Sequence, residues 1–169
     1  DIVVTSDGVK HSADWINSYR EQRQKVRSSI QSKGTRSSKR LLKRLSGKER
    51  TTATIINHTI SKSIVNSAKE QGKGISIEDL TNIRFTSKRR NKKFRTKLGR
   101  WSFGQLRSFL TYKAALNGVK LVAVEPRYTS QTCSSCFHIG ERKNKVFKCT
   151  NHKCEVDVVD ADENASKNI

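Results

Sequence analysis

The chain has 169 residues, of which 33% are hydrophobic, and a formal net charge of +20 at pH 7. This length suits a single domain, or a domain with one small insertion. No apolar run approaches the roughly 20 residues of a membrane-spanning helix, and nothing resembles a signal peptide. We therefore expect a cytoplasmic, nucleoid-associated protein. The charge implies a polyanionic partner, most often nucleic acid, because no helix with a bulky apolar face favours a membrane surface instead.

The positive charge is unevenly placed along the chain. Residues 1–100 carry a net charge of +17, whereas residues 101–169 carry only +3. The sequence contains no methionine and begins directly with the strand-like segment DIVV. We therefore expect it to be a piece of a longer protein.

The first half of the chain predicts one strand followed by helices. A strand from Ile2 to Thr5 is closed by an Asp-Gly turn at residues 7–8. Residues 20–50 contain twelve Lys and Arg and two Glu, a pattern that usually forms a solvated helical pair. Residues 51–70 predict a helix that ends before Gly72 and Gly74. Its buried stripe recurs every fourth residue, at Ile56, Ile60, Ile64 and Ala68.

The second half predicts a mixed α/β layout. GISIEDL is a short buried strand that ends in two acids, Glu78 and Asp79. Residues 84–100 hold nine Lys and Arg and no acid, which suits a flexible arm along a phosphate backbone. A helix with apolar residues at helical spacing follows and stops at Asn117-Gly118, before the strand VKLVAVE. Its apolar positions are Phe103, Leu106, Leu110 and Ala114.

The two basic tracts are the expected contacts to nucleic acid. Phosphate contacts by Lys and Arg supply most of the sequence-independent affinity for nucleic acid. The candidate residues are Arg36, Lys39, Arg40, Lys43, Arg44, Lys88, Arg89, Arg90, Lys92, Lys93 and Arg95.

All four cysteines lie in one short segment with the spacing of a zinc ribbon. Cys133 and Cys136 form one pair, and Cys149 and Cys154 form a second pair twelve residues later. Two such knuckles joined by a β-hairpin close a tetrahedral, structural Zn²⁺ site. Two disulfides are the alternative, which a reducing compartment disfavours. His152 could replace Cys154 as the fourth ligand, because it gives the tighter spacing after Cys149.

Five of the fifteen acids cluster between residues 155 and 163. Asp160 and Glu163 have the spacing of a capping box, with Asp160 as N-cap of the last helix. That pattern leaves Asp162 without a structural role. Carboxylates repel phosphate unless cations bridge the two, and Mg²⁺ commonly does so. Glu78 or Asp79, at the end of a strand, could complete such a site.

Three segments resemble the C-terminal half of TnpB, a family of insertion-sequence RNA-guided nucleases related to the type V CRISPR effectors. They are ISIEDL, WSFGQLRSFLTYKAALNGVKLVAVEPRYTSQTCSSC and FKCTNHKCEVDVVDADENASKNI. The resemblance implies an α/β RNase H-like (RuvC) fold, a mixed sheet with flanking helices and an inserted zinc-ribbon hairpin. It implies that Glu78 and Asp162 are the second and third catalytic carboxylates and hold Mg²⁺. Asp79, Glu125 and Asp160 are then structural neighbours.

The sequence departs from this family pattern at two places. Phe137 stands where the family usually has glycine after its second cysteine. The first catalytic Asp of the family would fall about four residues upstream of Asp1, outside the sequence. Asp7 aligns as a turn residue. We therefore expect residues 1–169 alone to be inactive.

These observations predict a nuclease core over residues 1–126, a zinc ribbon over 127–157, and a final catalytic motif with the start of the last helix over 158–169. The expected function is part of a transposon-associated, RNA-guided DNA endonuclease that cleaves phosphodiester bonds with two metal ions. Its partners would be a guide RNA, a target DNA and the missing N-terminal half or partner subunit. The alternative is a nuclease-inactive RNA- or DNA-binding module of the same family. A zinc-ribbon accessory factor of transposition leaves Glu78 and Asp162 unexplained.

Overall fold

The computed structural model describes residues 3–11, 14–81 and 103–169. These residues divide into two compact units, which are treated separately below. Unit 1 contains residues 3–11, 76–81 and 121–169, and unit 2 contains residues 14–75 and 103–120. None of the described helices is long and apolar enough to cross a membrane.

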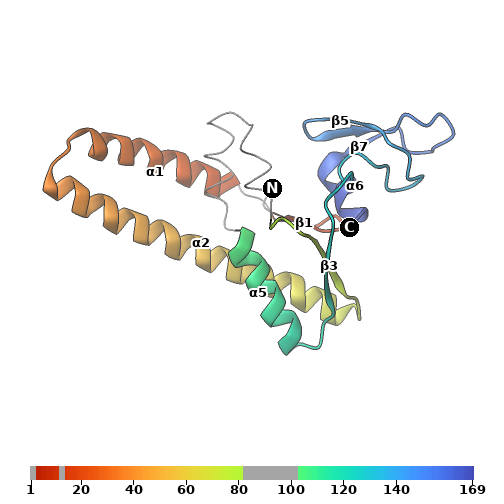
Figure 1. Cartoon of the computed structure of the whole chain (residues 1–169), viewed down its shortest axis with the longest axis horizontal. Helices are drawn as coiled ribbons and strands as arrows, with labels where there is room; N and C mark the ends of the chain where they lie inside the picture. Colours follow the sequence, from red (N-terminus) through yellow and green to blue (C-terminus); the bar gives the residue numbers. More distant parts are fainter. Residues whose placement is uncertain (1–2, 12–13, 82–102) are drawn as a thin grey trace. The chain divides into compact units, whose positions relative to one another are not determined.

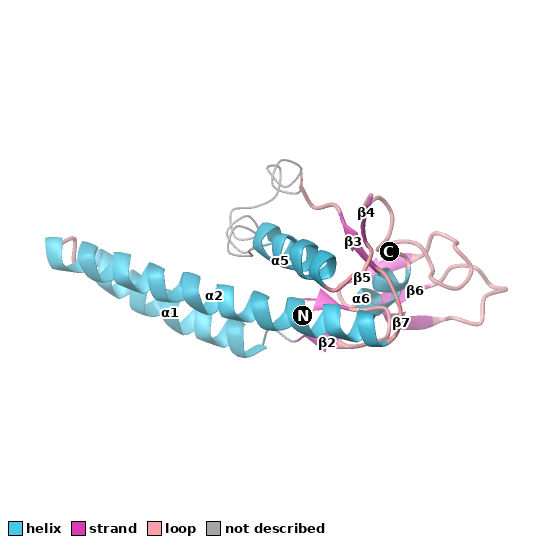
Figure 2. Ribbon diagram, turned by 90° about the horizontal axis from the view of Figure 1, so that it is seen from below, coloured by secondary structure: helices cyan, strands magenta, loops and turns pink. Residues whose placement is uncertain are grey.

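A long helical hairpin dominates unit 2. Helix α1 (Asp14–Ser32) and helix α2 (Arg36–Glu70) run side by side in opposite directions (Figures 1 and 2). The turn between them contains Gly34 at φ +64°, a left-handed conformation that glycine adopts at little cost. Thr35 caps α2, because its hydroxyl accepts a hydrogen bond from the backbone N–H of Ser38. The predicted solvated helical pair is confirmed, but its second helix continues without a break through the separate helix predicted over residues 51–70.

Helix α5 (Phe103–Leu116) packs on α2 and gives unit 2 its core. The predicted stripe on α5 is confirmed at Leu106, Leu110 and Ala114. On α2 only Ile60 of the predicted stripe is buried; Ile56, Ile64 and Ala68 are half-buried, and the buried face also includes Asn57, Ser61 and Val65. Asn57 is one of these, and its amide donates to Oε1 of Gln105 at 2.8 Å. Both helices end as predicted, at Gly72 (φ +63°) and Gly118 (φ +67°). The buried core residues of this interface include Ile60, Val65, Leu106, Leu110 and Ala114.

Strands β3 (Ile75–Glu78) and β4 (Leu121–Val124) pair with each other, as the sequence predicted two strands there. The N–H of Ile75 donates to the carbonyl of Lys120, and that of Asp79 donates to the carbonyl of Val124. The offset between partners stays constant, so the strands are parallel. The turn at residues 7–8 joins β1 (Val3–Val4) to β2 (Lys10–His11) in a hairpin, of which β2 was not predicted.

The cysteine-containing segment forms a three-stranded antiparallel sheet. Its strands are β5 (Glu141–Lys143), β6 (Val146–Lys148) and β7 (Val158–Asp160), and helix α6 (Ala161–Lys167) follows. Phe147 is fully buried at its centre with Cys133, Cys149 and Ala161. Gly140 passes so close that a Cβ there would lie 2.6 Å from the Phe147 ring, which excludes larger residues.

The described strands make three separate small sheets of two, two and three strands. The layout is therefore mixed α/β, as predicted. The single mixed sheet of a RuvC nuclease stays a prediction.

Candidate metal centre and carboxylate site

The four cysteine sulfurs lie close together in the ribbon segment. The Sγ atoms of Cys133 and Cys154 are 3.8 Å apart, and those of Cys136 and Cys149 are 3.7 Å apart. All four sulfurs lie within 4.8 Å of one another. For Zn–S bonds of 2.3 Å, the edge of a tetrahedron is about 3.8 Å. The four residues therefore fit a tetrahedral metal site.

The same distances decide between the alternatives left open by the sequence. A disulfide needs sulfurs about 2.05 Å apart, so none of these cysteines is paired. Among the described residues, the cysteines form the only group of three or more side chains placed to hold a metal ion, and His152 is outside it. His152 is exposed. Cys154, rather than His152, completes the set.

The acidity of the thiols also favours a bound cation. A hydrogen bond from the backbone of His138 lowers the pKa of the Cys136 thiol to about 6. The backbone of Asn151 acts the same way on Cys149, but burial and bonds within the thiol cluster outweigh it and raise the pKa of Cys149 to about 12. Thiols this close cannot all ionise alone, because like charges repel. A divalent cation removes that restriction.

Strand β7 carries the chain from the cysteine cluster to the clustered acids. Its residues pair with β6 in register, with Asp160 opposite Val146, and the N–H of Ala161 donates to the carbonyl of Lys145. Helix α6 starts directly afterwards, so Asp162 lies in its first turn. The pairing of β7 with β6 therefore determines where Asp162 lies.

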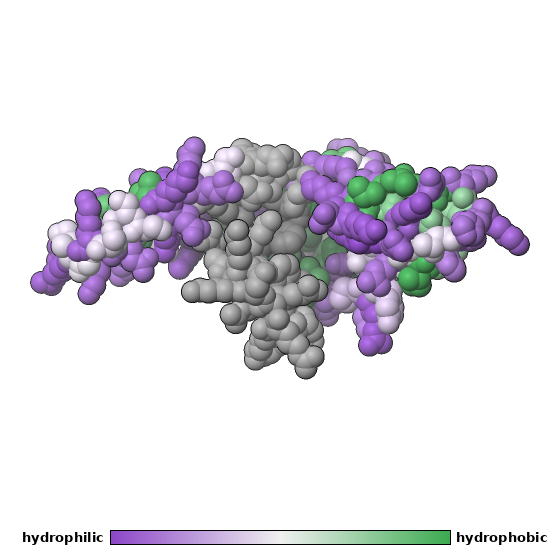
Figure 3. Space-filling view, turned by 90° about the horizontal axis from the view of Figure 1, so that it is seen from above, coloured by the Kyte–Doolittle hydropathy of each residue, from purple (hydrophilic) through white to green (hydrophobic). Residues whose placement is uncertain are grey.

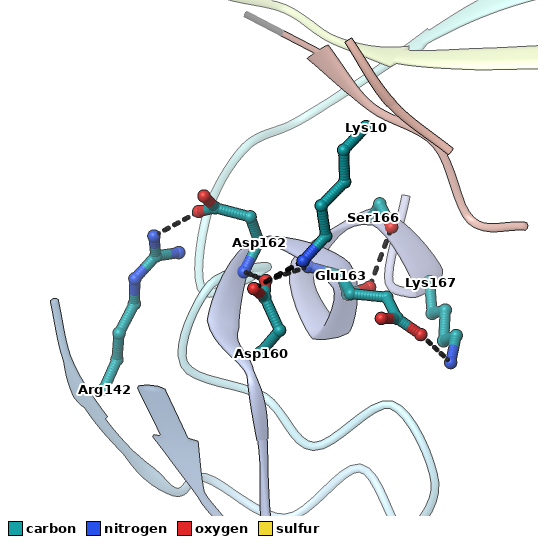
Figure 4. Close-up of polar contacts among 7 residues, drawn as sticks. All are labelled: Lys10, Arg142, Asp160, Asp162, Glu163, Ser166 and Lys167. Carbon is teal, nitrogen blue, oxygen red and sulfur yellow. Dashed lines mark hydrogen bonds and ion pairs between the residues drawn. The ribbon is translucent and has the colours of Figure 1, made fainter. Parts of the chain in front are cut away.

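Asp162 forms an ion pair that the sequence did not predict. Nη2 of Arg142, on β5, donates to Oδ1 of Asp162 at 2.6 Å (Figure 4). The interpretation that Asp162 lacks a structural role is therefore wrong. Both side chains are about 30% exposed, so this pair contributes little to stability. It does show that a cationic group is favourable at this carboxylate.

Asp160 is the helix cap, as predicted. Its Oδ1 accepts hydrogen bonds from the backbone N–H groups of Asp162 at 2.9 Å and Glu163 at 3.0 Å. Its other oxygen lies 2.6 Å from Nζ of Lys10, which reaches it from β2 (Figure 4). The hydrogen bond from Lys10 holds the pKa of Asp160 below its usual value. The capping box is not reciprocated, because the Glu163 carboxylate instead pairs with Lys167 at 2.9 Å.

Glu78 ends β3 and is half-buried. One of its carboxylate oxygens accepts a hydrogen bond of 2.6 Å from the hydroxyl of Thr129. Asp79 is exposed, and its carboxylate accepts from the backbone N–H of Thr81 at 3.1 Å and from the Thr81 hydroxyl. Asp79 therefore belongs to a turn, which leaves Glu78 as the carboxylate that could serve a metal.

The predicted nucleic-acid contacts divide into two groups. Five lie on the first half of α2 and are exposed, where hydrophilic side chains predominate over the α1–α2 hairpin (left of Figure 3). These are Arg36, Lys39, Arg40, Lys43 and Arg44. The other six lie outside the described residues, as does Asp1. They are Lys88, Arg89, Arg90, Lys92, Lys93 and Arg95.

Sequence reasoning missed the partners of the carboxylates. Each partner lies on a different segment of the chain from the acid that it contacts. Local spacing therefore could not predict the contacts of Thr129, Arg142 and Lys10. Two asparagines were also missed, although both stand in the final motif: one lies on α6 and the other is its C-cap. Asn164 and Asn168 are four residues apart, the spacing that places two side chains on one helix face.

Comparisons with known proteins agree with the resemblance. Residues 103–169 match the family model of the Cas12f1-like TNB domain. A TnpB-like protein of Methanocaldococcus jannaschii is 32% identical over 134 residues, which cover 79% of this chain and 48% of that protein. The CRISPR-associated endodeoxyribonuclease Cas12f1 of Sulfoacidibacillus thermotolerans is 39% identical over 117 residues, which cover 67% of this chain and 25% of that one.

A solved structure shares the fold. It is a cryo-EM structure of a Cas12f1–sgRNA–target DNA complex, with a TM-score of 0.72 and 21% identity over 94% of this chain. The match covers 42% of the Cas12f1 chain. The chain thus spans less than half the length of the relatives described above. Together with the cysteine cluster, these matches show that the chain belongs to the TnpB/Cas12f family.

Proposed function

We propose that this chain is the nuclease-bearing part of an RNA-guided DNA endonuclease, with a RuvC-like active site to which Glu78 and Asp162 contribute. The observation that carries the proposal is the position of Asp162. It lies in the first turn of α6, is held there by pairing between β6 and β7, and faces a guanidinium 2.6 Å away. A carboxylate whose backbone is fixed by strand pairing and whose side chain already pairs with a cation suits a metal ligand at a phosphodiester.

The residues present fit one metal ion at the cysteines, and a second kind is proposed at the carboxylates. Zn²⁺ fits the four thiolates, which leave no open position for chemistry, so its role would be structural. Mg²⁺ prefers carboxylate oxygens and would be held by Glu78 and Asp162. Bound there, it would stabilise the charge that develops on the oxygens of the cleaved phosphodiester.

Contacts of this chain with nucleic acid would depend on its positive charge. The five exposed basic residues on α2 suit contacts to phosphates of a guide RNA or its hybrid with target DNA. In a guided nuclease, sequence is selected by base pairing, so the protein needs to recognise only the shape and backbone of the hybrid. A basic, hydrophilic helical hairpin meets that requirement.

The test uses the complete protein that contains this chain, loaded with guide RNA. Glu78→Ala and Asp162→Ala should each lower the rate of Mg²⁺-dependent cleavage by about 10²-fold or more, because several kcal/mol of charge stabilisation are lost. Target binding should stay within a few-fold of the unsubstituted protein. Asp160→Ala is the matched control: it removes a neighbouring carboxylate with a capping role and should leave cleavage measurable. An active Asp162→Ala beside an inactive Asp160→Ala would refute the assignment.

One observation favours a second candidate, a nuclease-inactive module that only binds RNA or DNA. Among the described residues no three carboxylates gather into a metal site, since the cysteines are the only such group. A binding module predicts that Glu78→Ala and Asp162→Ala change nothing in the same assay, and that the unsubstituted complete protein does not cleave.

A further inference from the structure

Thr129 is buried and makes a contact that its position in the chain does not explain. Only 8% of its surface is exposed, and its hydroxyl lies 2.6 Å from Oε1 of Glu78. The carbonyl of Pro126, at 3.3 Å, is the weaker acceptor by distance. Because a hydroxyl has one hydrogen to donate, the shorter bond shows that it points at Glu78. A charge-assisted bond of this length is among the stronger hydrogen bonds in proteins.

The loop that carries Thr129 is itself held by helix α6. The side-chain amide of Asn168 donates to the carbonyl of Thr129 at 2.9 Å and to that of Thr132 at 2.7 Å. The amide of Asn164 donates to the same Thr132 carbonyl at 2.7 Å. Oδ1 of Asn164 accepts from the N–H of Ser134 at 2.9 Å. Both asparagines therefore bind the backbone that leads into the first cysteine knuckle.

These contacts join the two candidate carboxylates through the ribbon. Asn164 is 2% exposed, so its bonds are shielded from water and are costly to break. Asp162 lies in the first turn of the same helix, and the loop that Asn164 binds contains Thr129, which binds Glu78. Cys133 follows Thr132 directly, so a metal ion held by the four thiolates would fix the same backbone.

We propose that Thr129 is a positioning residue for Glu78, and that Asn164 and Asn168 hold it in place from α6. This inference rests on the proposed function, because it assigns Glu78 to the catalytic metal site. The hydroxyl occupies one lone pair of Oε1 and fixes the direction of the carboxylate. The other oxygen keeps its lone pairs for a cation. Bonds of this kind to metal-binding carboxylates typically change metal affinity or activity by about 10–100-fold when they are removed.

The main variant is Thr129→Val in the complete protein with guide RNA, since valine keeps the shape and removes the hydroxyl. Single-turnover cleavage of bound target should slow by about 10–100-fold, or require a correspondingly higher Mg²⁺ concentration, with target affinity unchanged. Thr129→Ser keeps the hydroxyl and should restore most of the rate. Thr150→Val is the matched control, because the Thr150 hydroxyl donates to the Ile139 carbonyl rather than to a carboxylate.

A merely structural role would give a different pattern. It would lower the midpoint of thermal unfolding in both valine variants and leave their cleavage rates alike at a temperature where both are folded. Asn168→Ala tests whether the asparagine holds Thr129 in place. This variant should also slow cleavage, as Thr129→Val does. If Thr129→Val cleaves as fast as the unsubstituted protein while Glu78→Ala is inactive, the inference is overturned and the proposed function stands. If Glu78→Ala is fully active, both are overturned.

Discussion

The two units of this chain use polar residues in opposite ways. In unit 1 the functional side chains are held by buried or half-buried bonds, such as Thr129 to Glu78 and Asn164 to the knuckle backbone. In unit 2 the five basic residues at the start of α2 are exposed, and their hairpin is stabilised by apolar packing elsewhere. Metal chemistry requires atoms fixed within fractions of an ångström, whereas attraction to phosphates requires only charge.

This contrast predicts two kinds of mutational effect. Substitutions in unit 1 should change metal binding or cleavage rate while the affinity for nucleic acid stays similar. Substitutions of basic residues in unit 2 should lower the affinity for nucleic acid and its dependence on salt concentration. The cleavage rate of bound target should stay similar. A unit 1 variant that changes only the affinity for nucleic acid, or a unit 2 variant that changes only the cleavage rate, would contradict this contrast.

The largest effect is expected from removing the metal of the ribbon. The chain should bind one Zn²⁺ through Cys133, Cys136, Cys149 and Cys154, and structural zinc of this kind contributes on the order of 10–16 kcal/mol to local folding. A chelator or Cys149→Ser should therefore unfold the ribbon. Elemental analysis and calorimetry measure the two consequences. His152→Ala should retain the metal, and its loss in that variant but not in Cys154→Ser would reverse the ligand assignment.

The next effect is on nucleic-acid binding. Replacing the five exposed basic residues of α2 by glutamine should reduce the slope of log K against log salt by up to about 4.5, at roughly 0.9 per phosphate contact. Binding to an RNA–DNA hybrid is measured between low and moderate salt. Replacing Lys143 and Lys153, exposed lysines of the ribbon segment, serves as the charge control. An unchanged slope in the α2 variant would show that this hairpin does not contact the backbone.

Local patterns in the sequence predicted most elements of the fold. The stripe on α5, the stops at Gly72 and Gly118 and the cluster of four cysteines all follow from spacing within one segment. Strand β7 was missed because it is only three residues long and pairs with β6 across the second knuckle. Tertiary pairing, rather than propensity, makes it a strand.

The sequence predicted the carboxylates of the candidate site but not the residues that contact them. Glu78 and Asp162 follow from the resemblance to TnpB, whereas Thr129 and Arg142 bind them from segments that are distant in sequence. The distance in sequence is 51 residues between Glu78 and Thr129. Spacing rules describe neighbours on one helix or strand, and they contain no information about such pairs.

Asp160 gives a smaller, pH-dependent effect. Asp160→Ala should cost about 0.5–2 kcal/mol at pH 7, because it removes the helix cap. Asp160→Asn keeps a capping oxygen and loses only the charge beside Lys10. The folded pKa of Asp160 is depressed, so the advantage of the unsubstituted protein over Asp160→Asn is present above pH 3.8. It should disappear as the pH falls through the lower folded value.

Unfolding in urea at several pH values measures this difference. The hydrogen bond that Lys10 donates to Asp160 raises the pKa of Lys10, so the same advantage should persist on the alkaline side until the pH rises through a value above 10.5. A difference between the two proteins that does not depend on pH would mean that Asp160 acts only as a cap.

The smallest effect concerns Phe137, at which the resemblance to TnpB leads us to expect glycine. Its φ is +58°, in the left-handed region, which costs an L-residue roughly 1–2 kcal/mol. The turn needs this conformation, because the N–H of Phe137 donates to the carbonyl of Cys133 and the N–H of Cys133 donates to the carbonyl of His138. The side chain is 74% exposed and buries little surface in exchange. Glycine would adopt this backbone conformation at little cost.

Phe137→Gly should stabilise the zinc-loaded ribbon by about 0.5–1 kcal/mol, because part of the relieved strain is offset by the greater freedom of glycine in the unfolded chain. Asn144→Gly is the matched control in the β5–β6 turn. Asn144 also has positive φ, at +56°, but asparagine tolerates it, so the gain should be smaller. Urea unfolding of both variants measures the difference. Destabilisation by Phe137→Gly, or weaker binding to nucleic acid, would show that the exposed ring makes a contact that compensates for the strained backbone.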